Sequence, residues 1–213
     1  MRKTISILCI MCVCVIPVSA WAQWTSVYET GQNNSIGIGA HISHVRINDS
    51  DMKQNGLTVN YAFDDVLGFG IQMLMSFNEF LAMELCVDNM MASDIHMKVN
   101  NQQAKIGEIT TIPVTLSTRF YLPTDTIVKP YLGAGIGYYF NDFEKNNNLS
   151  MQGGMSLDDA FGFHYCFGAD FWINRLENTA LNFDIKYLKP DTQNDHLDWD
   201  AWNIGFGIMY YFQ

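Results

Sequence analysis

The sequence at residues 202–212, Trp-Asn-Ile-Gly-Phe-Gly-Ile-Met-Tyr-Tyr-Phe, alternates between two kinds of side chain. Large apolar side chains occupy every even position from Trp202 to Phe212, and the odd positions begin with Asn203, Gly205 and Gly207. Successive side chains of a β-strand point to opposite faces. The pattern therefore predicts a strand with one large apolar face and one face of mostly smaller or polar residues.

The same alternation returns along the rest of the chain, whereas helical periodicity is weak. No stretch after the first 22 residues reaches 18 consecutive apolar residues, the length that would indicate a spanning helix. Together with 202–212, the alternating segments predict an all-β protein of eight strands. The other seven segments are 35–46, 69–77, 81–88, 112–120, 131–140, 161–171 and 181–188.

The two faces of these strands decide which way the sheet is oriented. In the segment 161–171, for example, Phe161, Phe163 and Tyr165 alternate with Gly162 and His164. If the apolar faces pointed inward, they would overfill an eight-stranded barrel, whose interior only just holds its side chains. They would also leave a glycine-rich exterior with few charges. Turning the apolar faces toward lipid and the small, polar faces toward the lumen removes both conflicts, so we predict a transmembrane barrel.

The connections between the predicted strands alternate in length. The short ones, 78–79, 123–128 and 174–178, alternate with long polar stretches at 48–67, 89–111, 141–160 and 189–200. Outer-membrane barrels have short periplasmic turns and long extracellular loops, and an even strand number closes the sheet without a free edge. The predicted fold is thus an eight-stranded antiparallel transmembrane β-barrel with that layout.

Composition and the N-terminus place the chain outside the cytoplasm. The 213 residues carry a formal net charge of −10 and a pI near 4.7, which argues against nucleic acid as a partner. Arg2 and Lys3, a short apolar run and the sequence Ala20-Trp21-Ala22 have the form of a cleavable secretory signal. We predict a signal peptide at residues 1–22 and a barrel domain at 23–213.

Several distinctive motifs occur from Phe77 onward, and the most specific is Lys129-Pro-Tyr-Leu-Gly-Ala-Gly135. It resembles the Arg-Pro-Tyr-Val-Gly-Ala-Gly motif of the OmpW family of outer-membrane barrels. Three residues depart from the family pattern. Val114 and Ala201 stand where the family usually has proline, and Tyr211 stands where it usually has arginine. Further matches are Glu84, which lies in the position of the family's Glu-Leu strand, and the segments 112–114, 157–162, 168–174, 200–202 and 210–212.

The resemblance implies a location, an activity and partners. It implies the outer membrane of a Gram-negative bacterium and a narrow channel that passes small hydrophobic molecules, with exit sideways into lipid. The expected partners are outer-membrane lipid and lipopolysaccharide, such solutes, and the assembly machinery that would read the C-terminal strand ending at Phe212. No cofactor and no metal is expected, because the five histidines are scattered without the spacing of a Cys/His motif.

Ionisable residues on the small, polar faces are the candidate functional site. Such groups are costly at membrane depth unless they are paired or solvated, so we expect them to point inward and bond one another. Two interpretations stay open: a structural salt-bridge network that fills the lumen, or a polar gate at the periplasmic end below an apolar vestibule. The predicted set is Glu84, Asp88, Arg119, His164, Asp170, Asp184 and Lys186.

Two other function classes compete with transport. A barrel enzyme acting on lipid would need a nucleophile and a base together, but the adjacent Ser43 and His44 face opposite sides of their strand. We therefore expect no enzymatic activity. A closed structural or adhesive barrel whose extracellular loops bind a partner is the main alternative. Cys86 and Cys166 lie on nearly opposite strands, beyond the reach of a disulfide, and are expected to be free thiols.

Overall fold

The computed structural model describes residues 35–54, 57–99, 102–145, 159–173, 178–191 and 199–212. The predicted signal peptide at 1–22 lies outside these ranges, as do most of the predicted connections 141–160, 174–178 and 189–200. Within the described ranges, no helix is long and apolar enough to cross a membrane. The strands are β1 (Ser35–Ile47), β2 (Ser50–Gln54), β3 (Leu57–Phe63), β4 (Val66–Ser76), β5 (Leu81–Val99), β6 (Gln102–Tyr121), β7 (Val128–Lys145), β8 (Ala160–Trp172), β9 (Thr179–Asp191) and β10 (Ala201–Phe212).

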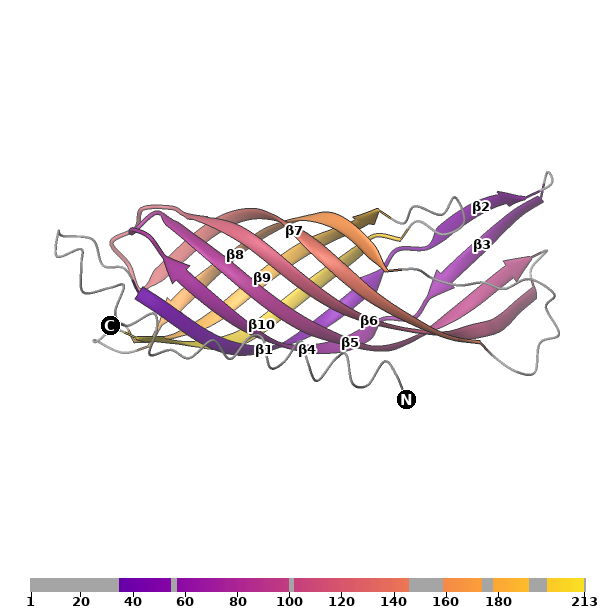
Figure 1. Ribbon diagram of the computed structural model, residues 1–213, viewed down its shortest axis with the longest axis horizontal. Coiled ribbons are helices and arrows are strands. Elements are labelled where there is room, and N and C mark those ends of the chain that lie inside the picture. Colours follow the sequence, from indigo (N-terminus) through magenta and orange to yellow (C-terminus); the bar gives the residue numbers. More distant parts are fainter. Residues whose placement is uncertain are drawn as a thin grey trace.

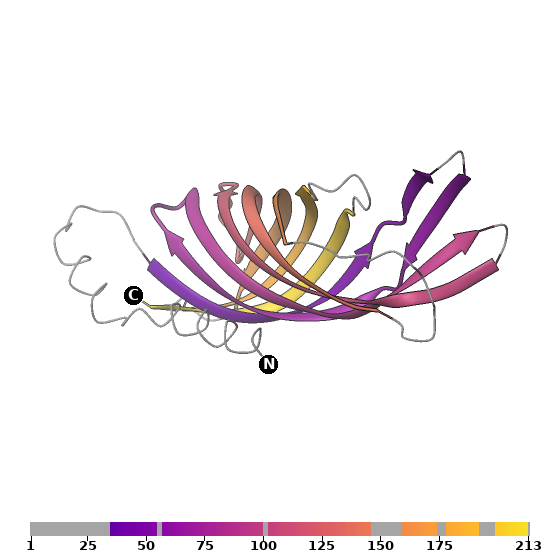
Figure 2. The same cartoon turned by 45° about the vertical axis from the view of Figure 1, so that its right-hand side comes forward.

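Eight of these strands form a closed antiparallel barrel (Figures 1 and 2). Going round the ring, the order is β5-β4-β1-β10-β9-β8-β7-β6, and β6 pairs with β5 to close it. The first and last barrel strands pair from Ile36 opposite Phe212 to Ile47 opposite Ala201. All eight predicted strands are present, so the predicted fold is confirmed. Closure satisfies the backbone groups that an open edge would leave unpaired in lipid.

The barrel turns its apolar faces outward. Ile42, Phe163 and Phe206 remain 67%, 56% and 51% exposed, whereas their strand neighbours Ser43 and His164 are buried. A soluble domain does not normally expose such a continuous apolar surface, because contiguous apolar patches are contact sites. The predicted orientation, with large apolar residues toward lipid and small or polar ones toward the lumen, is confirmed.

The turn between β4 and β5 explains how this pair of strands reverses direction. The side-chain oxygen of Asn78 accepts hydrogen bonds from the backbone N–H groups of Phe80 (2.8 Å) and Leu81 (2.9 Å). The N–H of Phe77 donates to the carbonyl of Leu81 at 2.9 Å. Asparagine favours turns for this reason, since its side chain can replace a backbone acceptor. The predicted tight turn at 78–79 is present.

Two predicted loops contain strand instead. Residues 48–67 include the β2–β3 hairpin, and most of residues 89–111 continues β5 and β6. Two register shifts in the β5–β6 pair, at Met90/Ser93 and Ile95/His96, change which side chains share a face and so interrupt the period-two pattern. The extensions project beyond the barrel rim together with β2 and β3 (Figures 1 and 2). Strand β3 pairs with the upper part of β5, and β2 pairs with β3.

Gly135 in β7 marks a close approach inside the barrel wall. A Cβ atom at this position would lie 2.1 Å from the backbone carbonyl oxygen of Leu116 and 2.6 Å from the His164 ring. The carbonyl belongs to the ladder between β6 and β7 and can move only with its strand. Glycine is therefore required here by space.

We expect Gly135→Ala to lower the free energy of unfolding by about 1–3 kcal/mol, because overpacking forces a backbone shift. Denaturant unfolding of the refolded barrel measures it. Gly137→Ala in the same strand is the matched control, since its Cβ would meet only side-chain atoms, at 3.0 Å or more. If both substitutions cost the same, the contact with the Leu116 carbonyl has no special weight.

Candidate functional site

The predicted inward-facing set lies inside the barrel. All seven residues are buried, and Glu84, Arg119, His164 and Asp170 have no exposed surface at all. They come from β5, β6, β8 and β9, because each occupies the strand face opposite the lipid-facing apolar residues. The alternation that defines the lipid face therefore also places these groups in the lumen.

Arg119 and Lys186 share the carboxylate of Glu84. The Arg119 guanidinium forms an ion pair with Glu84, and Lys186 Nζ donates to Glu84 Oε1 at 3.1 Å. Lys186 also lies 3.5 Å from Asp184 Oδ2. Fully buried charges of this kind persist only when they are paired, since the desolvation of each ion costs several kcal/mol. This ion-pair chain connects β6, β5 and β9 across the interior.

Below this ion-pair chain, Asp170 accepts hydrogen bonds from side chains on three different strands. Asn182 Nδ2 donates to its Oδ1 at 2.6 Å, and the hydroxyls of Tyr121 and Tyr211 donate to its Oδ2 at 2.7 and 3.4 Å. Arg119 Nη1 lies 3.9 Å from Asp170, which joins this group to the Glu84 ion pairs. We call the connected set of Glu84, Arg119, Asp170, Asp184, Lys186, Tyr121, Asn182 and Tyr211 the polar layer.

An aromatic ring supports the guanidinium in this layer. The Tyr131 ring lies below Arg119, with Cζ 4.3 Å from the ring centroid, and packs edge-on against Tyr121 at 5.4 Å. Asn182 Nδ2 donates to the Tyr131 hydroxyl at 3.1 Å. A desolvated cation over a ring face gains electrostatic stabilisation from the ring. Arg119 is therefore held by charge and by stacking together.

Two of the predicted residues lie in separate contacts. The His164 Nε2 atom is 2.7 Å from the Ser117 hydroxyl. Asp88 is hydrogen-bonded to His41 and Cys86 instead. Cys86 and Cys166 are both buried and free, as expected.

Apolar clusters lie above and below the polar layer. On several barrel strands the inward face changes from polar to apolar toward the extracellular end, for example from Lys186 to Leu188 on β9 and from Asp88 to Met90 on β5. Near the periplasmic end, Met209 and Trp172 pack against Tyr211 of the layer. The upper apolar cluster includes Val45, Val66, Met90, Tyr139, Leu188 and Trp199.

Sequence reasoning missed several members of the site. His41, Gln72, Ser117 and Asn182 were not predicted as site residues, although each lies on a polar, inward strand face. Their alternation with apolar neighbours was a usable signal. The sequence signal was weaker for Tyr121 and Tyr211, because they resemble ordinary aromatic residues near strand ends. Only the register of the strands brings their hydroxyl groups to Asp170.

Comparison with known proteins assigns the chain to a family. It is 26% identical over 194 residues to outer membrane protein W of Salmonella typhi, covering 83% of this chain and 81% of that one. It is 29% identical over 120 residues, half of each chain, to the uncharacterized outer-membrane protein y4mB of Sinorhizobium fredii. The crystal structure of the outer membrane protein OprG from Pseudomonas aeruginosa shares the fold, with a TM-score of 0.69, 20% identity, and coverage of 85% of this chain and 97% of that one.

The model of the OmpW family matches residues 18–201, which is most of the sequence. The relatives above are outer-membrane proteins by name, and the lipid-facing surface of the barrel agrees with that location. This chain is an outer-membrane β-barrel and belongs to the OmpW family.

Proposed function

We propose that the barrel is a narrow channel that takes small hydrophobic molecules from the outside through its extracellular half. The observation that carries this proposal is the change of lining along the lumen. The upper apolar cluster offers Val45, Met90 and Leu188 on inward faces where a water-filled pore would have polar side chains. An apolar solute entering there would leave water without having to displace hydrated charges.

The polar layer is proposed to be the gate below this vestibule. Arg119, Glu84 and Asp170 have no exposed surface, so water is excluded around them. An apolar solute that reached the layer would have to separate ion pairs in a region of low dielectric constant. The channel would thus be closed toward the periplasm in this state, and solute would leave sideways into lipid or wait for the layer to rearrange.

Single-channel conductance of the refolded barrel in a planar bilayer tests the channel directly. We expect small, discrete conductance that a long-chain amphiphile blocks, because the amphiphile chain would occupy the upper apolar cluster. A silent but well-folded barrel would contradict a channel and direct attention to the extracellular strands.

A substitution in the vestibule sharpens this test. We expect Leu188→Asn to raise the amphiphile concentration needed for half-maximal block by about tenfold, since burying an unpaired amide against an apolar chain costs roughly 1–3 kcal/mol. Leu188→Met keeps an apolar side chain of similar volume and is the matched control. Equal block of the two variants would place the amphiphile elsewhere.

A second candidate is a closed barrel whose extracellular part binds a partner. The observation in its favour is the sheet formed by β2, β3 and the upper parts of β5 and β6, which projects beyond the rim (Figure 2). Such a surface presents edge strands outside the membrane, and edge strands can pair with another chain. Silence in the bilayer measurement together with retained folding would favour this candidate.

A further inference from the structure

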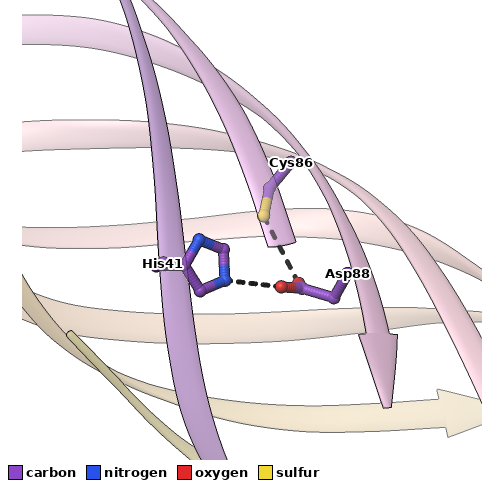
Figure 3. Close-up of side chains that lie close together, drawn as sticks. All are labelled: His41, Cys86 and Asp88. Atoms are coloured by element: carbon purple, nitrogen blue, oxygen red, sulfur yellow. Dashed lines mark hydrogen bonds and ion pairs between the residues drawn. The ribbon is translucent and has the colours of Figure 1, made fainter. Parts of the chain in front are cut away.

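His41, Cys86 and Asp88 are buried on inward strand faces and lie close together (Figure 3). His41 Nε2 lies 2.5 Å from Asp88 Oδ1, and Cys86 Sγ lies 3.3 Å from Asp88 Oδ2. One ligand atom from each residue lies within 4.8 Å of those of the other two, and all three side chains are buried. We propose that these residues form a binding site for a divalent transition metal ion of the zinc type.

The barrel wall is shaped so that these side chains can meet. His41 is on β1 and Asp88 on β5, and Gly70 of the intervening strand β4 is paired with both. Strands two positions apart are separated by about 9–10 Å, so their side chains must reach over the strand between them. A Cβ atom on Gly70 would lie 2.3 Å from Asp88 Oδ1 and 2.8 Å from His41 Nε2. Glycine at this position leaves the space in which the two ligand atoms lie.

The donor set fits a transition metal better than a hard cation. An imidazole nitrogen, a thiolate and a carboxylate are all zinc ligands, whereas Ca²⁺ and Mg²⁺ prefer oxygen alone. Three protein ligands leave a fourth tetrahedral position for water or a solute group. Zinc bonds of about 2.0–2.3 Å separate neighbouring ligand atoms by roughly 3.3–3.7 Å, so the His41–Asp88 contact must open by about 1 Å.

Buried hydroxyl groups beside the cluster have no hydrogen-bond partner among the described residues. Ser43 is two positions from His41 on the same face, and Thr115 is the register partner of Cys86. Buried polar groups are normally satisfied by protein or by ordered water. A metal-bound water molecule in the fourth position would give them a partner, as groups around a metal commonly hold its ligands.

The charge of the lumen also favours a cation. Among the described residues, the buried carboxylates of the lumen are Glu84, Asp88, Asp170 and Asp184, and the buried cationic side chains are Arg119 and Lys186. Lys186 is already paired with Glu84 and Asp184, which leaves His41 as the partner of Asp88. A divalent ion offsets part of this negative excess even though the Cys86 thiol must release its proton to solvent when it binds the metal.

Cobalt(II) substitution is the direct test, because a cysteine thiolate bound to Co²⁺ gives a near-ultraviolet charge-transfer band. Barrel refolded with Co²⁺ and passed through a desalting column should show this band at one ion per chain, and Zn²⁺ should remove it by competition. Cys86→Ser should abolish the band. Cys166→Ser, which removes the other buried thiol of the lumen, should leave it unchanged.

Affinity measurements with Zn²⁺ complete the test. His41→Gln and Asp88→Asn should each weaken Zn²⁺ binding by about 100-fold or more, since even groups behind the ligands change metal affinity by about 10–100-fold. Far-UV circular dichroism establishes whether each variant is folded. If either His41→Gln or Asp88→Asn fails to fold, the affinity of the other variant tests the proposal. The proposal is overturned if folded wild-type barrel binds no Co²⁺ or Zn²⁺, if the band survives Cys86→Ser, or if Cys166→Ser removes it. Those results would leave the His41–Asp88 contact as a hydrogen bond without a metal role.

Discussion

Replacing Arg119 with alanine is expected to lower the free energy of unfolding by about 3–5 kcal/mol, the usual cost of removing one partner from a buried ion pair. Arg119 is fully buried, pairs with Glu84 and lies 3.9 Å from Asp170. Without it, the partners left among the described residues are Lys186 at 3.1 Å for the carboxylate of Glu84 and neutral donors for Asp170. Denaturant unfolding of the barrel in lipid vesicles measures the loss.

The double variant Glu84→Gln/Arg119→Met is the control for charge. It removes both charges of the pair and keeps similar side-chain volumes, so no carboxylate at position 84 is left without its guanidinium partner. We therefore expect it to regain at least half of the lost stability. A double variant as unstable as Arg119→Ala would mean that shape, including the stacking of Arg119 on Tyr131, dominates.

The single variant Arg119→Ala also separates the two interpretations of the polar layer, a gate or a purely structural network. If the layer is a gate, Arg119→Ala should raise the leak conductance of folded barrels, because the guanidinium and the pairs it makes fill that level of the lumen. If the layer is only structural, stability falls and conductance stays at the wild-type value. Both quantities should therefore be measured on the same refolded sample.

Placing a charge on the lipid face is expected to have the second largest effect. Ile71 is near the middle of β4, is 50% exposed, and lies between Ala40 and Val87 on the outer surface. We expect Ile71→Arg to lower the free energy of unfolding in vesicles by about 2–4 kcal/mol, the measured range for arginine near the bilayer midplane. The cause is desolvation of the guanidinium in hydrocarbon.

Ile127→Arg provides a matched control. Ile127 is 68% exposed in the short connection between β6 and β7, outside the strands. The same substitution there puts the charge into water and should change stability by less than about 0.5 kcal/mol. A large cost at Ile127 or none at Ile71 would contradict the assigned position of the membrane.

The eight barrel strands and their two faces could be predicted from the sequence because the side-chain period of a strand is a local property. Segments such as 202–212 and 161–171 show it without reference to the rest of the chain. For the same reason, all seven predicted ionisable residues could be assigned to the lumen. The upper parts of β5 and β6 could not be predicted, since two register shifts interrupt the alternation that identifies a strand.

Which inward residues meet was decided only by the tertiary structure. Arg119 lies beside Glu84 and Asp170, and His41 reaches Asp88 over Gly70, because ring closure fixes one register for every pair of strands. Register joins residues far apart in the chain, and a slip of one residue would exchange the two faces of a strand. The sequence alone determined the face of each strand and so which side chains enter the lumen. Closure of the barrel set the depth of each side chain and its partners, because depth depends on the pairing of all eight strands together.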